Sequence, residues 1–337
     1  MATARVTLAE VARTAGVSRT TASFVLSGRT DMRISTDAQH RVLDAAERLG
    51  YRPNITARSL RTQVTNTIGL VSDTIATTQY AGQVIRGAIE AAHAGGRLLF
   101  VAETAGNPDV ESQLIDEMLD RQVDALVYAV MYTRQARLPP NLGSCPVVLL
   151  NCINDSFEGP VVLPDELEGG REAARALVEA GRTERVYAIG ARHRTPDAPD
   201  GIYAGCLRMD GAEEVLAAAG AGITGYVECA WEPEYGYEAV ANLLDSGQHP
   251  GSLICANDRV AFGAYQALQE RGRRVPGDVA VVSFDDSALA SWLRPPLSSV
   301  VLPHYELGKA AVNLLLDNDL APRTHLIPMR LDRKESV

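Results

Sequence analysis

The sequence lacks the features that mark membrane and exported proteins. Nowhere do its 337 residues contain about 18 consecutive apolar side chains, so no membrane-spanning helix is expected. The first ten residues contain no apolar segment followed by a small-residue cleavage site, which argues against a secretory signal. The five cysteines are an odd number without C-x-x-C spacing, so neither a disulfide framework nor a zinc site is indicated. These absences favour a cytoplasmic protein with reduced thiols.

The sequence motifs of common enzyme families are missing as well. There is no G-x-G-x-x-G after an expected strand, no G-x-x-x-x-G-K-[ST], no G-x-S-x-G and no H-E-x-x-H. The six histidines are scattered, without the spacing of metal ligands. Asp285 and Asp286 are adjacent carboxylates, but neighbouring side chains in a turn point apart, which disfavours a hydrolase built on this pair. We therefore expect no catalytic residue, no metal site and no cofactor.

What the sequence does have is an uneven distribution of charge. Hydrophobic residues make up 46% and charged residues 22%, as in soluble globular proteins, and the length suggests about two domains. Residues 1–62 hold ten arginines and five acids, a formal charge of +5, which leaves −15 for the remainder because the whole chain carries −10. A basic head on an acidic body is typical of a protein that binds a polyanion such as nucleic acid at one end. The alternative is a solvated helical surface that happens to be rich in arginine.

The basic head shows the pattern of three short helices. Thr7 and Glu10 have the spacing of a capping box, and Ser18 is a good N-cap for a second helix. A third helix is expected to start near Ser35 or Thr36. The side chains expected to be buried on it are Val42, Leu43, Ala46 and Leu49. Two helices joined through a tight turn at residues 15–17 are typical of a helix-turn-helix DNA-binding domain.

In such domains the second helix lies in the major groove with its first residues on the base edges. Arg19 and Thr20 are therefore the candidate base readers. An arginine can grip guanine with two hydrogen bonds, worth about 1–3 kcal/mol of discrimination. Ser18 and Thr21 are better suited to phosphate contacts, which position the helix without reading sequence. The alternative is a small helical domain whose exposed faces are merely polar.

From about residue 67 onward, short apolar runs alternate with amphipathic helical stretches. This alternation predicts parallel sheets flanked by helices, and the length of the body favours two lobes with a cleft. We expect a break near residues 160–165 and a return to the first lobe near residues 295–303. The expected strands are Ile68–Val71, Leu98–Ala102, Ala125–Val130, Val147–Leu150, Val186–Ile189, Gly225–Cys229, Leu253–Ala256 and Val279–Phe284. The expected helices include Val84–Ala94, Val110–Leu119, Glu168–Ala180, Glu234–Leu244 and Ala261–Glu270.

Polar and aromatic residues follow the expected strands, at the ends where open α/β sheets bind their ligands. Trp231 follows the sixth strand, and an aromatic platform with convergent polar groups is typical of a sugar or nucleobase site. Simpler roles remain open, because Asp258 and Asp286 would also serve as helix N-caps. Trp231 would also serve as a core residue and Tyr80 as packing on a dimer face. The polar and aromatic residues at strand ends are Asp73, Tyr80, Asn151, Trp231, Asn257, Asp258, Asp285 and Asp286.

Two segments, Val6–Ser23 and Leu49–Leu60, resemble the DNA-binding head of the LacI/GalR family of bacterial repressors. The resemblance runs over essentially the whole chain. It implies an N-terminal all-α helix-turn-helix head plus an α/β two-lobed periplasmic-binding-protein-like core with parallel sheets flanked by helices. The implied parts are a helix-turn-helix domain over residues 1–53, a hinge helix and linker over 54–65, and an effector-binding and dimerisation domain over 66–337. The first lobe would cover about 66–163 with a return near 297–322, and the second about 164–296.

The resemblance also implies roles for single residues. Leu60 resembles the leucine that two subunits insert between base pairs from the minor groove, and Arg208 would grip a ligand beside Asp285. The implied DNA-binding residues are Thr7, Ser18, Arg19, Thr20, Thr21, Phe24, Asn54, Ala57, Arg58 and Leu60. The implied effector-binding residues are Asp73, Tyr80, Asn151, Arg208, Trp231, Asn257 and Asp285.

The sequence departs from the family pattern at two positions. Phe24 lies where relatives place a polar or basic base reader, and phenylalanine can touch a thymine methyl group but cannot hydrogen-bond a base. Leu302 lies where many relatives carry a polar contact residue. The operator and effector preferences of relatives are therefore not carried over to this chain.

The sequence thus predicts a ligand-responsive transcriptional regulator, most simply a repressor. As a homodimer it would bind a palindromic double-stranded DNA operator and respond to a small-molecule effector, a sugar or sugar derivative. Two other classes stay open: a cytoplasmic two-lobed small-molecule sensor, and an enzyme on a Rossmann-like scaffold. Deletion of residues 1–62 discriminates between them, because only a regulator loses DNA binding and keeps ligand binding.

Overall fold

The computed structural model describes residues 6–27, 33–52, 64–78, 81–142, 145–193 and 202–337. The chain divides into two compact units, residues 1–65 and 66–337, and each is described by itself. Five candidate residues of the sequence analysis lie outside the described residues: Asn54, Ala57, Arg58, Leu60 and Tyr80.

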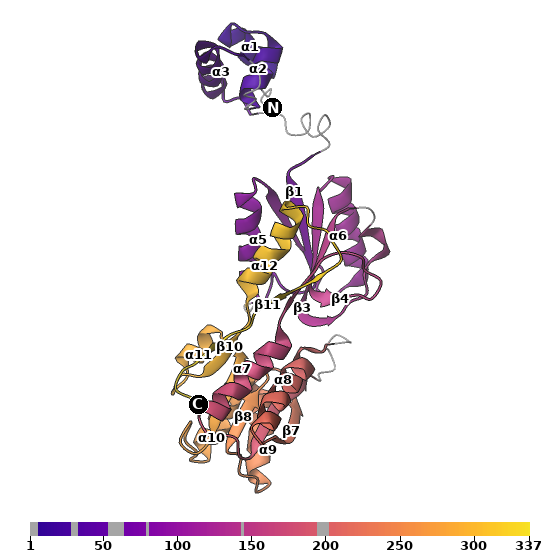
Figure 1. The fold of residues 1–337 in the computed structure, drawn as a ribbon. Coiled ribbons are helices and arrows are strands. Elements are labelled where there is room, and N and C mark those ends of the chain that lie inside the picture. The colour runs from indigo at the N-terminus through magenta and orange to yellow at the C-terminus, as the bar shows by residue number, and fades with distance from the viewer. Residues whose placement is uncertain (1–5, 28–32, 53–63, 79–80, 143–144, 194–201) are drawn as a thin grey trace. The chain divides into compact units, whose positions relative to one another are not determined.

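The described part of the first unit contains three short helices whose ends are set by local hydrogen bonds (Figure 1). The helices are α1 (Leu8–Ala15), α2 (Arg19–Leu26) and α3 (Thr36–Leu49). The capping box forms as expected: the Thr7 amide donates to Glu10 Oε2 at 2.7 Å, and Thr7 Oγ1 accepts from the Glu10 amide. Gly16 and Gly50 end α1 and α3 at φ of 66° and 62°, a region where a residue with a Cβ is strained.

A small apolar core joins the three helices. It consists of Val11, Ala12, Ala15, Ala22, Val42, Ala45 and Ala46. The expectation that Leu43 is buried is wrong, because its side chain is 51% exposed. The inward stripe of α3 runs through Val42, Ala45 and Ala46, and Leu43 lies about 100° round the helix from Val42.

The second unit begins with a parallel six-stranded sheet, here called the first lobe. Its strand order is β11-β5-β4-β3-β1-β2. Helices α5 and α12 cover one face and α6 the other, so the strands are apolar on both faces (Figure 1). The strands are β1 (Thr67–Ser72), β2 (Leu98–Glu103), β3 (Ala125–Gln135), β4 (Val147–Ile153), β5 (Val161–Pro164) and β11 (Thr324–Ile327). The helices are α5 (Gly82–Ala94), α6 (Pro108–Asp120), α12 (His304–Leu316) and the short 3-10 turn η1 (Pro140–Leu142).

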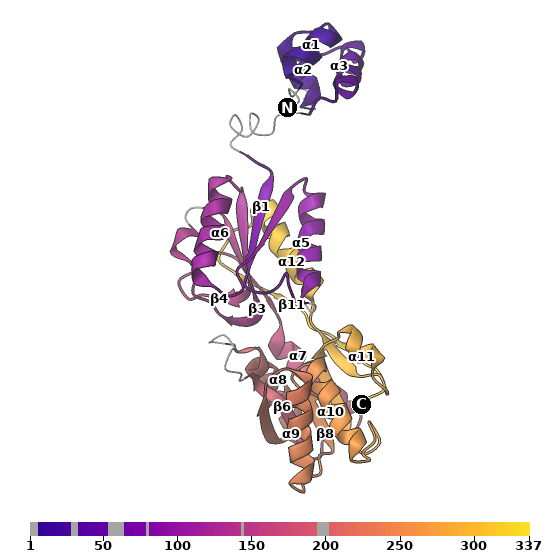
Figure 2. The same ribbon diagram turned by 180° about the vertical axis from the view of Figure 1, so that it is seen from behind.

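A second six-stranded sheet forms the second lobe, with strand order β12-β10-β9-β8-β6-β7. All neighbours are parallel except β12, which runs antiparallel to β10. Helices α7 and α8 cover one face (Figure 1), and α9 and α10 cover the other (Figure 2). The strands are β6 (Val186–His193), β7 (Ile223–Cys229), β8 (Ser252–Cys255), β9 (Ala280–Asp285), β10 (Ser298–Val301) and β12 (Leu331–Asp332). The helices are α7 (Glu166–Glu179), α8 (Ala204–Ala218), α9 (Pro233–Asp245), α10 (Asp258–Glu270) and α11 (Ala288–Trp292).

The chain passes between the two sheets three times. It leaves the first lobe between β5 and α7, returns between β10 and α12, and leaves again between β11 and β12. The expected start of the return near residue 297 is wrong, because β10 pairs with β9 in the second sheet and α12 is the first returning element. The third crossing was not predicted; it brings the C-terminal tail to the second lobe.

The helices of the second unit pack in crossing pairs, α5 with α12, α7 with α8 and α9 with α10. Glycines allow the close approach. A Cβ at Gly87 would lie 2.0 Å from the Tyr305 carbonyl oxygen, and one at Gly308 would lie 1.9 Å from that of Val84. Of the helices in the described part of the chain, none combines the length and the apolar character that crossing a bilayer requires.

Candidate functional site

The start of α2 presents small polar side chains and one arginine. Ser18 caps the helix: its Oγ accepts from the Thr21 amide at 3.0 Å and lies 2.8 Å from Thr21 Oγ1. Arg19 and Thr20 are exposed in the first turn. Phe24 lies one turn after Thr20 and is half-buried, so an aromatic ring follows the exposed first turn on the same helix face.

A second group of polar side chains converges between the two lobes of the second unit. It gathers where β3, β4 and β9 end and where α7, α10 and α12 begin, the edge at which parallel sheets bind ligands. The free space between these side chains is about 40 Å³, roughly the volume of one water molecule in the liquid. The lining residues are Met131, Tyr132, Thr133, Asn151, Glu166, Ala204, Arg208, Trp231, Asn257, Arg259, Asp285, Leu302, His304 and Leu307.

A fully buried ion pair lines this pocket. Arg208 Nε donates to Glu166 Oε2 at 2.7 Å and Nη2 donates to Oε1 at 3.2 Å, with both side chains 2% exposed. Burial works to lower the pKa of Arg208, but the Glu166 carboxylate outweighs it and the pKa is raised. The two-pronged grip expected from Arg208 is therefore made to a residue of the chain itself.

The crossing of α7 and α8 sets this pair. A Cβ at Gly170 would lie 1.9 Å from the Arg208 carbonyl oxygen, and one at Gly211 would lie 2.0 Å from that of Leu167. Only glycine allows the two backbones to approach this closely. The first turn of α7 and the second turn of α8 consequently lie side by side, which brings Glu166 against Arg208.

Asp285 ends β9 in an unusual backbone conformation. Its φ is 103° and that of Asp286 is 47°, two successive residues with a Cβ at positive φ, each costing on the order of 1–3 kcal/mol. Burial raises the pKa of Asp285 to about 7, with the Asp258 carboxylate raising it further and Arg208 opposing the shift. Asp285 thus places a carboxyl group that exchanges its proton near neutral pH beside the ion pair.

The possible N-cap roles of Asp258 and Asp286 are wrong, because Asn257 caps α10 and Ser287 precedes α11. Asp258 is instead buried and accepts from three serine side chains. Its partners are Ser283 at 2.5 Å, Ser299 at 2.7 Å, and the Ser287 hydroxyl and amide at 2.8 and 2.7 Å. These bonds tie α10, β9, β10 and the start of α11 together beneath Asp285.

Two predicted effector residues line the pocket while already holding local partners. Asn257 Oδ1 accepts from the Val260 amide at 2.9 Å, and Asn257 Nδ2 lies 3.3 Å from the Trp231 carbonyl oxygen. Trp231 Nε1 donates to the Gly190 carbonyl at 2.7 Å. The Trp231 ring is buried and meets Tyr132 edge-on at 6.1 Å, so these two rings form an aromatic wall.

On the first-lobe side, Asn151 lines the pocket and Asp73 does not. Asn151, at φ 61°, donates to the Val130 and Met131 carbonyls at 3.0 and 2.9 Å. Its Oδ1 lies 2.6 Å from Thr133 Oγ1. Asp73 Oδ1 accepts from the Met131 amide at 2.9 Å, so Asp73 supports the strand behind the pocket.

Comparisons with known proteins assign both units. Residues 7–54 match the lacI family of bacterial regulatory proteins, and residues 174–337 match the periplasmic binding protein-like domain. Catabolite control protein A of Priestia megaterium is 30% identical over 340 residues, which cover 98% of this chain and 99% of the relative. The chain belongs to the LacI family.

Solved structures show the same LacI-family fold over the full length. The lac repressor dimer bound to operator and the anti-inducer ONPF has a TM-score of 0.79 at 23% identity, covering 98% of this chain and 99% of that one. The transcriptional regulator CelR in complex with cellobiose has a TM-score of 0.66 at 28% identity, covering 99% and 100%. Helices α1 and α2 are thus the helix-turn-helix of a LacI-family transcriptional regulator, and the two sheets are its periplasmic-binding-protein-like core.

Sequence reasoning missed several pocket residues of this LacI-family regulator, among them Tyr132, Thr133, Arg259, Glu166 and His304. Glu166 opens α7, and its acidic neighbourhood gives no sign that it faces an arginine 42 positions later. His304 starts α12, directly after the return crossing, and burial lowers its pKa to about 4, so its imidazole is neutral. Leu302, two residues earlier, is a departure from the family pattern. That departure was the available sign that this segment, and with it His304, lies at the pocket.

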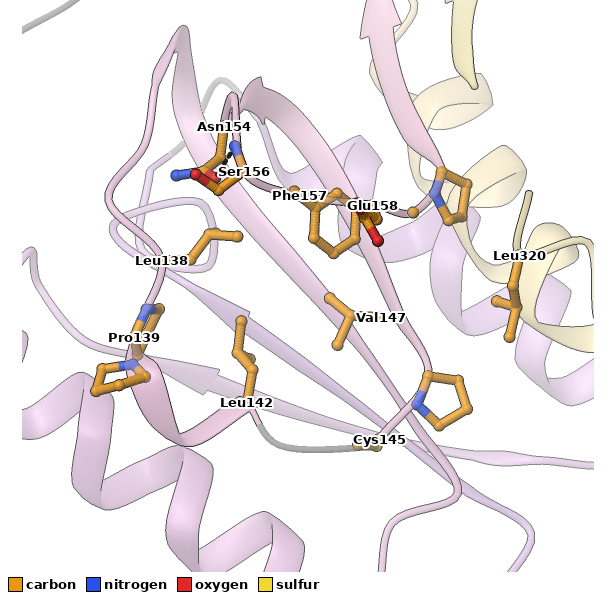
Figure 3. Close-up of a pocket in the computed structure, with 14 residues that line it drawn as sticks. Leu138, Pro139, Leu142, Cys145, Val147, Asn154, Ser156, Phe157, Glu158 and Leu320 are labelled. Carbon is orange, nitrogen blue, oxygen red and sulfur yellow. Dashed lines mark hydrogen bonds between the residues drawn. The ribbon is translucent and has the colours of Figure 1, made fainter. Parts of the chain in front are cut away.

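A larger depression on the first lobe, of about 540 Å³, is a weaker candidate (Figure 3). Its wall is formed mainly by proline, leucine and phenylalanine side chains, such as Leu138 and Phe157. The polar Asn154 is engaged locally: it donates to the Ala136 carbonyl at 3.0 Å and accepts from the Ser156 amide at 2.9 Å. Without convergent polar groups this depression is a poor site for a small polar ligand.

Proposed function

We propose that this LacI-family regulator is a cytoplasmic repressor without catalytic activity, which binds a palindromic operator as a homodimer and is controlled by a sugar-like effector. One observation supports it above the others: one chain joins a helix-turn-helix to a pocket with an aromatic wall, a buried arginine and a carboxyl group. That combination suits the recognition of hydroxyl-rich rings. CelR, which has the same fold, has been solved with cellobiose.

In the head, we assign base reading to the exposed first turn of α2. Arg19 and Thr20 would face base edges, with Phe24 one turn later against a thymine methyl group. Thr7, Ser18 and Thr21 would bond phosphates and so fix the helix in the groove. From the family resemblance alone, further DNA contacts are assigned to Asn54, Ala57, Arg58 and the wedge residue Leu60.

In the core, we assign effector contacts to the residues that converge between the lobes. Asp285 is the strongest of these, because its carboxyl group faces the pocket beside Arg208 and titrates near neutral pH. Trp231 and Tyr132 would pack against an apolar ring face, and Asn151, Asn257 and Arg208 would frame the polar edges. Asp73 would act indirectly, because its carboxylate accepts a hydrogen bond from the Met131 amide of β3 and so supports the strand that lines the pocket. Tyr80 is assigned an effector contact from the family resemblance alone.

The size of the pocket requires movement on binding. Drug-sized ligands fill roughly 300–1,000 Å³, many times the 40 Å³ of free space here. An effector therefore enters a form in which lobes or lining side chains have moved apart. A ligand that prefers that form changes the affinity of the head for DNA, and bound DNA changes the affinity of the pocket for the ligand by the same factor. The coupling free energy between the two sites is typically about 1–3 kcal/mol.

The dimer is assigned to the exposed apolar edge of the first lobe. On edge strand β2, Leu98, Phe100 and Val101 are 57%, 38% and 37% exposed, and Ile89 on neighbouring α5 is 48% exposed. Edge strands that expose large apolar side chains are usually covered by a partner. A homodimer formed at this edge would carry two heads, and a palindromic site offers two half-sites for them.

The test is selection of bound DNA from a random pool by the full-length chain, repeated with candidate sugars. A palindromic consensus is expected, and its enrichment should change with one sugar class. A chain lacking residues 1–62 should lose DNA binding and keep ligand binding. Failure to prefer any symmetric site over scrambled duplex, with and without sugars, would contradict the proposal.

A further inference from the structure

The guanidinium group of Arg208 has its Nε/Nη2 edge occupied, and its third nitrogen bonded, from within the chain. Two of its nitrogens donate to Glu166, and Nη1 donates to the Ala256 carbonyl at 2.7 Å. Two aromatic rings lie close to the same group: the Phe284 ring centroid is 4.6 Å and the Trp231 ring centroid 5.5 Å from Arg208 Cζ. An incoming ligand therefore meets an arginine whose Nε/Nη2 edge is already taken.

Glu166 also lies close to a hydroxyl group of the other lobe. Its Oε1 lies 3.2 Å from the Thr133 hydroxyl of β3, and that hydroxyl is also 2.6 Å from Asn151 Oδ1. The Glu166 carboxylate thus lies between an arginine of the second lobe and a hydroxyl of the first. Removing either member of a buried ion pair is strongly unfavourable, because the other charge is left uncompensated.

Both arginines that line the pocket already have carboxylate partners, because Arg208 pairs with Glu166 and Arg259 pairs with Glu232 at 2.5 Å. A ligand carboxylate or phosphate would have to displace Glu166 from Arg208, and would then lie near two carboxyl groups of the chain, Glu166 and Asp285. A hydroxyl group has no such conflict, because it can donate to either carboxylate without adding charge.

We propose that Glu166 is a specificity-determining residue: it occupies the anion-binding edge of Arg208, so that the pocket takes uncharged, hydroxyl-rich ligands and rejects carboxylates and phosphates. This inference rests on the proposed effector role of the pocket. Glu166 acts as the resident counter-ion of Arg208, in the place where an anionic ligand would otherwise bind.

The decisive experiment is rescue of a Glu166→Ala variant by a small carboxylate. The substitution leaves Arg208 without its partner and opens a gap of carboxylate size. We expect the thermal unfolding midpoint of full-length Glu166→Ala to rise when sodium propionate replaces sodium chloride at equal ionic strength. Propionate should bind this variant about tenfold or more tightly than the unsubstituted chain.

Two controls separate this effect from a general response to propionate. Glu168→Ala removes a carboxylate from the same helix turn, where Glu168 pairs with Arg175 at 2.6 Å on the surface, and it should show no rescue. The double variant Glu166→Ala/Arg208→Met lacks the buried cation and should also show none. Rescue of Glu166→Ala no greater than that of Glu168→Ala overturns the proposal.

A variant of the same size keeps the test decisive if Glu166→Ala does not fold. Glu166→Gln retains the side-chain volume and loses the charge, so its unfolding midpoint should fall, and the further change Arg208→Met should restore part of the loss. A midpoint equal to that of the unsubstituted chain would overturn the proposal. Neither measurement involves DNA, so both stand or fall separately from the operator selection.

A calorimetric comparison then tests specificity itself. Matched pairs of a neutral sugar and its uronate, glucose with glucuronate and galactose with galacturonate, are titrated into the full-length chain and into Glu166→Gln. The uronate-to-neutral affinity ratio should rise in the variant by about tenfold or more. Tighter binding of a uronate than of its neutral parent by the unsubstituted chain overturns the proposal, whatever the rescue shows.

Discussion

Lys334 Nζ lies 2.6 Å from Asp286 Oδ1, so the C-terminal tail is joined to the turn that carries Asp285. The same ammonium group lies 2.7 Å from Asp332, and the side chain is only 14% exposed. Nearby, Ser336 Oγ donates to the Val281 carbonyl at 2.6 Å. The last residues of the chain thus brace β9 at the point where its backbone enters two consecutive positive-φ residues.

This brace predicts a stability loss that is specific to one of the chain's two lysines. Lys334→Met removes the ammonium group and leaves Asp286 without its cation, so we expect a loss of about 1–3 kcal/mol in urea unfolding. Lys309→Met is the matched control, because Lys309 only approaches the Tyr305 ring, at 5.8 Å. Equal losses in the two variants would show that Lys334 does not brace the turn.

The carboxyl group of Asp285 predicts a dependence of stability on pH. Its pKa is about 7 in the folded chain and near 3.9 in the unfolded chain. Between these values the folded chain binds the extra proton, so the group's contribution to stability decreases as pH rises from about 4 to 7 and stays low above that. Asp285→Asn, which cannot ionise, should be more stable than the unsubstituted chain at pH 8, and the difference should shrink towards pH 5.

The matched control for this titration is Asp245→Asn. The hydrogen bonds from Arg271 hold the pKa of Asp245 below its usual value, so removal of this carboxylate should give no gain at pH 8. Urea unfolding at the two pH values measures both variants. A gain for Asp285→Asn that is as large at pH 5 as at pH 8 would mean that another group titrates.

Arg19 predicts a change in base preference. Because a two-pronged contact reads one base pair, Arg19→Ala should lose about 1–3 kcal/mol of discrimination at a single position in each half-site. Competition binding with single-base variants of the selected operator measures this, with Arg13→Ala on α1 as the control. A uniform weakening on every sequence would assign Arg19 to a phosphate.

Addition of a single methyl group at Gly170 should cause a large loss of stability. In Gly170→Ala the new Cβ would lie 1.9 Å from the Arg208 carbonyl oxygen, so α7 and α8 must separate. We expect a loss of about 1–3 kcal/mol or more, together with weaker effector binding, because Glu166 and Arg208 part with their helices. Gly82→Ala, whose Cβ has open space at the start of α5, should be near neutral. Unfolding in urea compares the two, and a loss as small as that of Gly82→Ala would contradict this account of the crossing.

Much of the architecture could be predicted because the eight apolar runs expected as strands are strands of the two sheets. Four short strands were missed: β5, β10, β11 and β12 have two to four residues each, too few for a periodic pattern. The return crossing lies between β10 and α12, within the expected range 295–303, but the lobe boundary expected near residue 297 is too early because the chain there enters β10.

The pocket could be predicted in part, because strand ends collect polar groups whatever their partners. Asn151, Arg208, Trp231, Asn257 and Asp285 do line it. The positions of strand ends in the sequence do not indicate which polar side chains already have hydrogen-bond or ion-pair partners within the chain. The Glu166–Arg208 pair arises from the packing of two helices, and the support of β3 by Asp73 arises from a hydrogen bond across strands.

The three passages between the sheets have a consequence for a chain with a severed backbone. If the peptide is cut between β5 and α7, the C-terminal fragment still supplies α12, packed on α5, and β11, paired with β5, to the first sheet. The two fragments would remain associated, because elements of the C-terminal fragment form part of the first lobe. A nick at that position would therefore yield a two-piece protein that stays assembled and can still bend about its remaining connections.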